Sequence, residues 1–175
     1  ILMGEARRSC DLTERLDVLR VFRQQGRKGA EARSADANGC ARVDQAARQW
    51  RRLIGARDEA AGFDPDDAGQ LLALAYPDRI AQQRAPNGPA YLLANGRGAR
   101  LPEWEIRLRQ PMLVAATLDA GEGEGLIYLA ATLRAETLSK LMPGHVQSEE
   151  EVRWDAEQQI VVARDSQKSI VLGKQ

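Results

Sequence analysis

The chain is poor in the residues that build disulfide frameworks and metal sites. It contains two cysteines and one histidine among 175 residues. Cys10 and Cys40 have neither a CxxC partner nor a histidine nearby, so we expect two reduced thiols, as in a cytoplasmic protein. His145 has no clustered carboxylates around it in the sequence and no GxSxG motif to serve. The sequence therefore predicts no metal-ligating and no catalytic residues.

Long hydrophobic runs are also missing, and so is a net charge. No apolar run approaches the ~20 residues that a membrane-spanning helix needs, and the opening residues ILMGEARRS lack the apolar stretch of a secretory signal. We therefore expect no membrane partner. The formal net charge is zero, but residues 1–62 and 76–118 each contain more basic than acidic side chains. This uneven distribution favours an anionic partner without requiring one.

Hydrophobic periodicity predicts helices in the first part of the chain. Apolar side chains recur three to four residues apart in residues 11–25 and again in residues 40–54, where Trp50 is expected in the core. A third helix is predicted after Asp64, with Pro65 at its first position. Residues 26–39 combine glycines and charges without apolar periodicity, and they are predicted to form a mobile loop.

After Pro77 the pattern changes to that of short strands. Strands are predicted around residues 80–84, 91–101, 112–120 and 126–133, followed by a short helix at 134–143 and further strands towards the end. Proline disfavours helix in the residue before it, so Tyr76-Pro77 ends the last helix. The predicted fold class is α+β, with a small helical bundle followed by an OB-like β-barrel that has one inserted helix.

The predicted domains follow this change of period. Residues 1–76 are expected to form a partial helical domain, and residues 77–175 an OB-like barrel that is truncated at its C-terminal end. The chain begins at Ile1 and finishes on KSIVLGKQ, which has the pattern of a strand. We therefore expect it to be a fragment of a longer protein.

Several segments together resemble one helicase family. The segments are LLALAYPDRIAQQR, YLLANGRGARL, LVAATLD and IYLAATL, supported by CARVDQAARQWRRL. They are similar to the C-terminal region of the HrpB-type ATP-dependent helicases, bacterial relatives of the DEAH-box RNA helicases. The resemblance covers most of residues 40–165, and YPDRIAQQR with LANGRGARL is its most specific part.

The resemblance implies a chain of two RecA-like motor domains, a winged helix, a ratchet-like helical domain and then a barrel. This sequence departs from the full pattern, because it has no GxxxxGK[ST] phosphate loop and no Asp-Glu-x-His box. ATP and Mg²⁺ are therefore expected in the motor domains of the parent protein, and no cofactor is expected in this chain. By itself the chain is predicted to be inactive as an ATPase.

The arginines are the candidate binding residues. In an OB-like barrel the first strands and their loops line a groove, where cations can follow the backbone of a single strand. The predicted contacts there are Arg79, Arg84, Arg97 and Arg100, with Tyr91 as a stacking platform. A helical ratchet would add Arg48 and Arg51. The alternative is that all of these arginines are solvated surface charges.

Two functions remain open at this point. The chain could guide single-stranded nucleic acid, RNA by the resemblance, beside the RecA-like and winged-helix domains of the same parent. Alternatively it could be a docking module for the motor or for a protein partner, with little contact to nucleic acid. The first function predicts that Arg48, Arg51, Arg97 and Arg100 converge on one groove, and the second that they are scattered.

Overall fold

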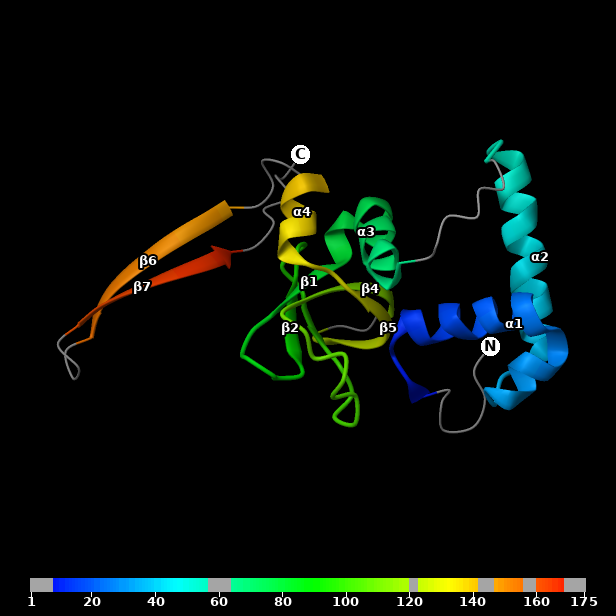
Figure 1. Ribbon diagram of the computed structural model, residues 1–175. Coiled ribbons are helices and arrows are strands. Elements are labelled where there is room, and N and C mark those ends of the chain that lie inside the picture. The colour runs from blue at the N-terminus through cyan, green and yellow to red at the C-terminus, as the bar shows by residue number, and fades with distance from the viewer. Residues whose placement is uncertain (1–7, 57–63, 120–122, 142–146, 156–159, 169–175) are drawn as a thin grey trace.

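The computed structural model describes residues 8–56, 64–119, 123–141, 147–155 and 160–168. Within these ranges the chain forms four α-helices and a closed five-stranded barrel (Figure 1), so the predicted α+β class is confirmed. None of the described helices is long and apolar enough to cross a membrane. His145 lies outside the described residues.

Two helices make up the first part of the chain. Helix α1 (Leu12–Ala32) is capped by Asp11, whose carboxylate accepts a hydrogen bond from the backbone N–H of Thr13 at 2.8 Å. Helix α2 (Ala37–Leu53) is capped by Asp36 in the same way, and the bonded N–H belongs to Asn38. Each cap satisfies a donor that the first helical turn leaves without a partner.

The prediction of a mobile loop for residues 26–39 is wrong, because most of this segment is helical. Gly26, with φ of 66°, interrupts α1, but the helix resumes and continues to Ala32. Small side chains make this packing possible, since Ala30, Ala35 and Ala37 are buried against Val18 and Leu19 of α1. Because these buried residues are alanines, the segment shows no periodic spacing of large apolar side chains, and its sequence therefore predicted a loop.

The placement predicted for Trp50 is also wrong. Its side chain is 66% exposed, whereas Cys40 and Asp44 of the same helix are buried. Helix α1 packs beside the first half of α2, and the second half of α2 extends beyond it (Figure 1). Trp50 therefore belongs to an exposed apolar stripe of α2.

The third helix joins the first part of the chain to the barrel. Helix α3 (Pro65–Ala75) is followed by a 3₁₀ turn, η2 (Pro77–Arg79), and strand β1 begins at Ile80, as the proline signal predicted. α3 packs on the outside of β4 and β5, and Ala73 contributes to a cluster with Ile80 and Val114. At Gly69 the helix approaches so closely that an added Cβ would lie 2.0 Å from the carbonyl oxygen of Thr132.

The barrel consists of five strands in the closed order β1-β2-β3-β5-β4. Only the β3–β5 pair is parallel among the pairs of this barrel. The core contains large side chains from several strands and loops, including Leu93, Leu101, Leu108, Leu113 and Ile127. The strand bounds are β1 Ile80–Gln83, β2 Ala90–Leu93, β3 Gly98–Arg100, β4 Met112–Leu118 and β5 Gly125–Thr132.

The last elements do not belong to the barrel. The predicted short helix is α4 (Ala135–Leu141), and its Leu138 packs in the cluster that contains Ala73, Ile80 and Val114. Strands β6 (Gln147–Asp155) and β7 (Ile160–Lys168) pair with each other in a separate two-stranded sheet. We expected these strands in the barrel, but β1 pairs with both β2 and β4 and so closes the barrel without them.

Contacts cross the predicted boundary between residues 76 and 77. α3 packs on the barrel, and Cys10 is part of the barrel core. The backbone N–H of Ala130 in β5 donates to the carbonyl oxygen of Cys10 at 2.8 Å, so the residues before α1 continue the edge of this strand. The division into two domains at this boundary stays a prediction.

Candidate nucleic-acid interface

The outer face of β2 and β3 carries Arg100 and lies beside Arg84. Tyr91 and Leu93 are buried, so Ala90 and Leu92 face outward by the alternation of a strand. Their partners across the pair are Arg100 and Gly98, which therefore face outward too. We call this surface, together with Arg84, which follows β1 directly, the β2–β3 face.

Gly98 leaves a space on this face that Arg84 partly fills. A Cβ at Gly98 would lie 3.2 Å from Nη2 of Arg84 and 3.5 Å from Cγ of Glu124. Arg84 is exposed, and its backbone N–H donates to the carbonyl oxygen of Ala90 at 3.0 Å. Nη2 of Arg84 therefore lies over Gly98, the first residue of β3, close to the side chain of Glu124.

Arg100 lies at the other end of β3 and forms an ion pair with Glu103. The same carboxylate also pairs with Arg109 at 3.5 Å. One acidic group therefore serves two guanidinium groups, and this group of three keeps a positive charge. The carboxylate of Glu103 is 67% exposed, and exposed ion pairs of this kind contribute only about 0–1 kcal/mol. Arg100 is therefore only weakly tied to Glu103.

Arg97 has a different environment. Its guanidinium donates to the carbonyl oxygens of Gly123 at 3.0 Å and of Asp119 at 3.3 Å, and it pairs with the carboxylate of Asp119 at 3.6 Å. These contacts tie the β2–β3 turn to the β4–β5 turn. Since the donors of Arg97 are directed at these backbone groups, we assign it a structural role and leave it out of the proposed interface.

Arg79 is likewise occupied by the protein itself. It is half-buried, and its Nη1 donates to the carbonyl oxygen of Ala116 at 3.1 Å. Its guanidinium carbon lies 4.7 Å from the centre of the Tyr76 ring, within the range of a cation–π contact. These two contacts fix the junction between α3 and β1, which explains why an arginine follows Pro77 so closely.

Tyr91 cannot be the predicted stacking platform, because its side chain is 0% exposed. Its hydroxyl donates to the carbonyl oxygen of Gln110 at 3.0 Å. Burial raises the pKa of this hydroxyl to about 12, and the hydrogen bond from Gln83 opposes that shift. A ring without exposed surface offers no face to a base, so this prediction is wrong.

Exposed aromatic side chains that the sequence did not single out lie elsewhere on the barrel. Tyr128 is 50% exposed on β5, two residues beyond Leu126, which pairs with Arg100. Trp104 is 65% exposed and follows Glu103. The segment LIYLAAT around Tyr128 is apolar almost throughout, so it gave no sign of which side chains face outward.

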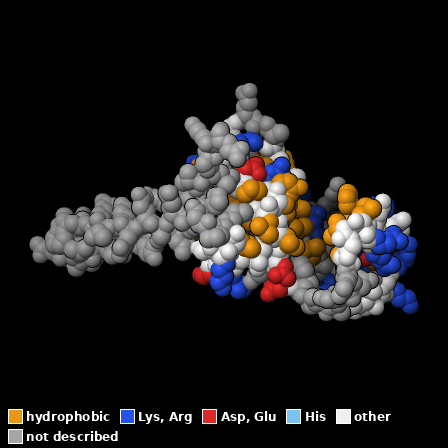
Figure 2. Space-filling view, turned by 90° about the horizontal axis from the view of Figure 1, so that it is seen from above, with side chains coloured by type: hydrophobic (Ala, Val, Ile, Leu, Met, Phe, Trp, Pro, Cys, Tyr) orange, Lys and Arg blue, Asp and Glu red, His pale blue; other side chains and the backbone are white. Residues whose placement is uncertain are grey.

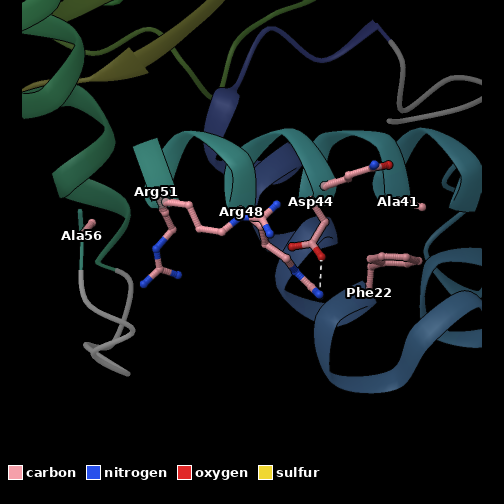
Figure 3. Close-up of a pocket in the computed structure, with 8 residues that line it drawn as sticks. Phe22, Ala41, Asp44, Arg48, Arg51 and Ala56 are labelled. Atoms are coloured by element: carbon pink, nitrogen blue, oxygen red, sulfur yellow. Dashed lines mark ion pairs between the residues drawn. The ribbon is translucent and has the colours of Figure 1, made fainter. Parts of the chain in front are cut away.

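The two arginines predicted on α2 lie apart from the β2–β3 face. Arg48 and Arg51 line a cavity of about 590 Å³ on α2, where Asp44 forms an ion pair of 2.6 Å with Arg48 (Figure 3). α2 and the barrel occupy different parts of the molecule (Figure 1). The predicted arginines therefore do not converge on one groove, but form two separate basic surfaces.

The chain is similar in structure to two solved structures of E. coli HrpB. The first, described as a DExH-box NTPase, shares 25% sequence identity with a TM-score of 0.54, and the match covers 90% of this chain and 20% of that chain. The second, described as a DEAH/RHA helicase, shares 24% identity with a TM-score of 0.49, and the match covers 92% and 17%. No protein-family model and no curated protein matches the chain.

The match to the first structure confirms the resemblance to HrpB-type helicases that the sequence indicated. The likeness extends over nearly the whole of this chain, with a TM-score of 0.54 for the first structure. The chain spans about a fifth of the length of the HrpB protein in that structure.

Proposed function

We propose that the chain is an accessory part of an ATP-dependent helicase that holds single-stranded nucleic acid, RNA in the first instance, beside the motor. The β2–β3 face would contact the strand. The motor, with its ATP and Mg²⁺, would lie in RecA-like domains of the same parent protein, next to a winged helix. The likeness to E. coli HrpB supports this assignment, since that protein is described as a helicase and as an NTPase.

The topology of the barrel supports an OB-like identity. OB-folds are five-stranded Greek-key barrels that bind oligonucleotides on the face of strands 2 and 3. Here too five strands close the barrel out of sequential order. The β2–β3 face is the corresponding surface.

A single observation carries the proposal. On the β2–β3 face, Gly98 has no side chain, Nη2 of Arg84 and the carboxylate of Glu124 lie 3.2 Å and 3.6 Å from the place of its missing Cβ, and Arg100 faces outward two residues along the same strand. Guanidinium groups bind phosphate oxygens through paired N–H donors. Tyr128 and Trp104 would add stacking contacts for bases, and such contacts are tolerant of sequence.

The proposed mechanism is electrostatic and involves no covalent step. Arg84 and Arg100 would each contact a phosphate, and Arg100 would exchange its exposed partner Glu103 for that phosphate. Glu103 would then remain paired with Arg109, so this carboxylate keeps a cation. The strand would be held loosely enough to move whenever the motor advances it.

A docking role is the second candidate. The separation of Arg48 and Arg51 on α2 from Arg97 and Arg100 on the barrel favours this role, and exposed apolar side chains favour it too. Trp50, Leu53 and Ile54 of α2 are 66%, 69% and 74% exposed, and Leu71 of α3 is 66% exposed. Figure 2 shows hydrophobic side chains gathered on the face seen from above. Large exposed apolar patches mark interaction surfaces. In this case the motor domains or a protein partner would cover them.

The proposed strand contact is tested by titrating the chain into fluorescent single-stranded RNA and DNA at several salt concentrations. Each phosphate contact with a single strand contributes about 0.7 to the slope of log K against log salt. The double variant Arg84→Gln/Arg100→Gln removes two contacts. We therefore expect weaker binding and a slope smaller by about 1.4.

Arg20→Gln is the matched control, because Arg20 is an exposed arginine of α1 that pairs only at the surface with Asp17. It should leave both affinity and slope unchanged. An unchanged slope in the double variant would exclude the β2–β3 face as the contact. If neither nucleic acid binds and the chain instead binds isolated motor domains, the docking role is the correct one.

A further inference from the structure

The cavity on α2 has a lining that is rich in arginine. Three arginines, Arg48, Arg51 and Arg52, line it together with a single acidic residue, Asp44. The wall that α1 contributes is the ring of Phe22 (Figure 3). The cavity thus combines an excess of positive charge with one aromatic surface.

Asp44 holds the cationic side of the cavity in place. Its side chain is 8% exposed, and its two carboxylate oxygens pair with Nε of Arg23 and Nη2 of Arg48, each at 2.6 Å. Arg23 comes from α1 and Arg48 from α2, so the carboxylate also joins the two helices. A guanidinium has five N–H donors, and Arg48, whose side chain is 71% exposed, keeps donors for a ligand after this ion pair.

The helix dipole alone does not account for these charges. Basic residues in the last turn of a helix interact favourably with its negative end, and Arg51 and Arg52 lie in the last turn of α2. Arg48 lies a turn earlier, and the dipole requires neither its ion pair with a buried carboxylate nor an aromatic wall. The ion pairs of Asp44 join α1 to α2, but this join does not require an aromatic wall beside Arg48.

We propose that this cavity binds one nucleotide unit, with the phosphate on Arg48 and Arg52 and the base against Phe22. Its volume of about 590 Å³ falls within the range of about 300–1,000 Å³ that small-molecule sites occupy. Guanidinium groups match the geometry of phosphate oxygens, and aromatic rings stack on bases of any sequence. The unit could be a free mononucleotide or one residue of a strand.

This inference deepens the proposed function, because it rests on the same class of ligand, but it concerns a different surface. The β2–β3 face would hold the strand through Arg84 and Arg100, and the α2 cavity would add a second point of contact. Two separated points on one strand would bind more tightly than either alone.

The first experiment needs no variant. Nuclear magnetic resonance spectra of the full chain are recorded while uridine 5′-monophosphate, inorganic phosphate or uridine is added. We expect saturable shifts at Phe22, Arg48 and Arg52, with the monophosphate binding more tightly than phosphate, and uridine most weakly. Shifts confined to the barrel, or no saturable shifts with the monophosphate, would overturn the inference.

The second experiment compares Arg48→Gln/Arg52→Gln with the control Arg42→Gln. Arg42 lies on the same helix and pairs at 3.5 Å with Asp36, outside the cavity. Asp44 keeps its pair with Arg23 in the double variant, and circular dichroism will check that the helices remain. Loss of two charge-assisted contacts should weaken binding of the monophosphate at least tenfold, whereas the control should bind as the wild type does. Equal affinities in all three proteins would refute the site.

Titration of the wild type and both double variants with single-stranded RNA distinguishes this inference from the proposed function. If RNA binds and only the barrel variant weakens it, the cavity plays no part and the proposed function stands. If RNA does not bind but the monophosphate does, and the α2 variant abolishes this, the cavity is a site for free nucleotides and the proposed function fails. If both variants weaken RNA binding, both proposals are supported.

Discussion

Gly69→Ala is a substitution for which helix propensity and packing predict opposite changes in the free energy of unfolding. Gly69 lies inside α3, where alanine is more favourable than glycine by about 1 kcal/mol. However, its Cβ would lie 2.0 Å from the carbonyl oxygen of Thr132, whereas real Cβ contacts are essentially never shorter than 3.0 Å. The obstacle is backbone of β5, so it cannot rotate away as a side chain could.

The magnitude follows from the packing that must open. α3 has to move away from β5 by about 1 Å or more, and this loosens the cluster in which Ala73 meets Val114 and Leu138. Overpacking of this kind costs typically 1–3 kcal/mol, and a clash with backbone belongs at the upper end. After subtraction of the propensity gain, we expect a net loss of about 2 kcal/mol.

The assay is thermal and urea denaturation of the wild type and the variant, followed by circular dichroism. For a chain of this length, a loss of about 2 kcal/mol lowers the melting temperature by roughly 4–8 °C. Ala46→Gly, at an exposed position inside α2, measures the propensity difference where no packing is involved. A Gly69→Ala protein that is more stable than the wild type would refute the packing between α3 and β5 described here.

Two further predictions concern buried groups that can ionise. The pKa of Tyr91 is raised from 10.0 to about 12 in the folded chain, so the unfolded chain loses this proton first. The free energy of unfolding should therefore fall by roughly 2–3 kcal/mol as pH rises from 10 to 12. Urea denaturation across this range should show this loss in the wild type and a smaller one in Tyr91→Phe, and an equal pH dependence in both proteins would contradict the prediction. Burial and the charge of Glu105 raise the pKa of the Cys10 thiol to about 11. At pH 8 this thiol should therefore react with a thiol reagent only after urea unfolds the chain. Rapid labelling of Cys10 in the folded protein would show that the thiol is not buried.

Much of the fold could be predicted because it depends on patterns of large side chains. The stripe Leu12, Leu16, Leu19 marked the first helix, and the Tyr76-Pro77 signal placed the start of β1 correctly. The segment 26–39 failed because its packing depends on alanines, whose burial follows from the neighbouring helix. Such burial is a property of the tertiary structure, so local periodicity does not reveal it.

The candidate site was predicted less well, because an arginine has the same sequence signal whatever it contacts. Arg79 and Arg97 donate to backbone carbonyl oxygens of distant segments, and only the closed barrel brings those segments near. Arg48 was predicted as a phosphate contact, but its partner Asp44 and the wall at Phe22 could not be anticipated. These contacts link residues on two helices whose crossing the sequence does not specify.

The interface and the core of the barrel follow from one choice of register. Tyr91 pairs with Ala99 and Ala90 pairs with Arg100, so the pairing that buries the tyrosine ring turns the guanidinium outward. Because side chains alternate along a strand, a slip of one residue would exchange the two faces. It would bury the charge of Arg100 among the leucines of the barrel core, and burying an unpaired charge is costly. The hydrophobic pattern that stabilises the barrel therefore also fixes the face of β3 on which Arg100 lies.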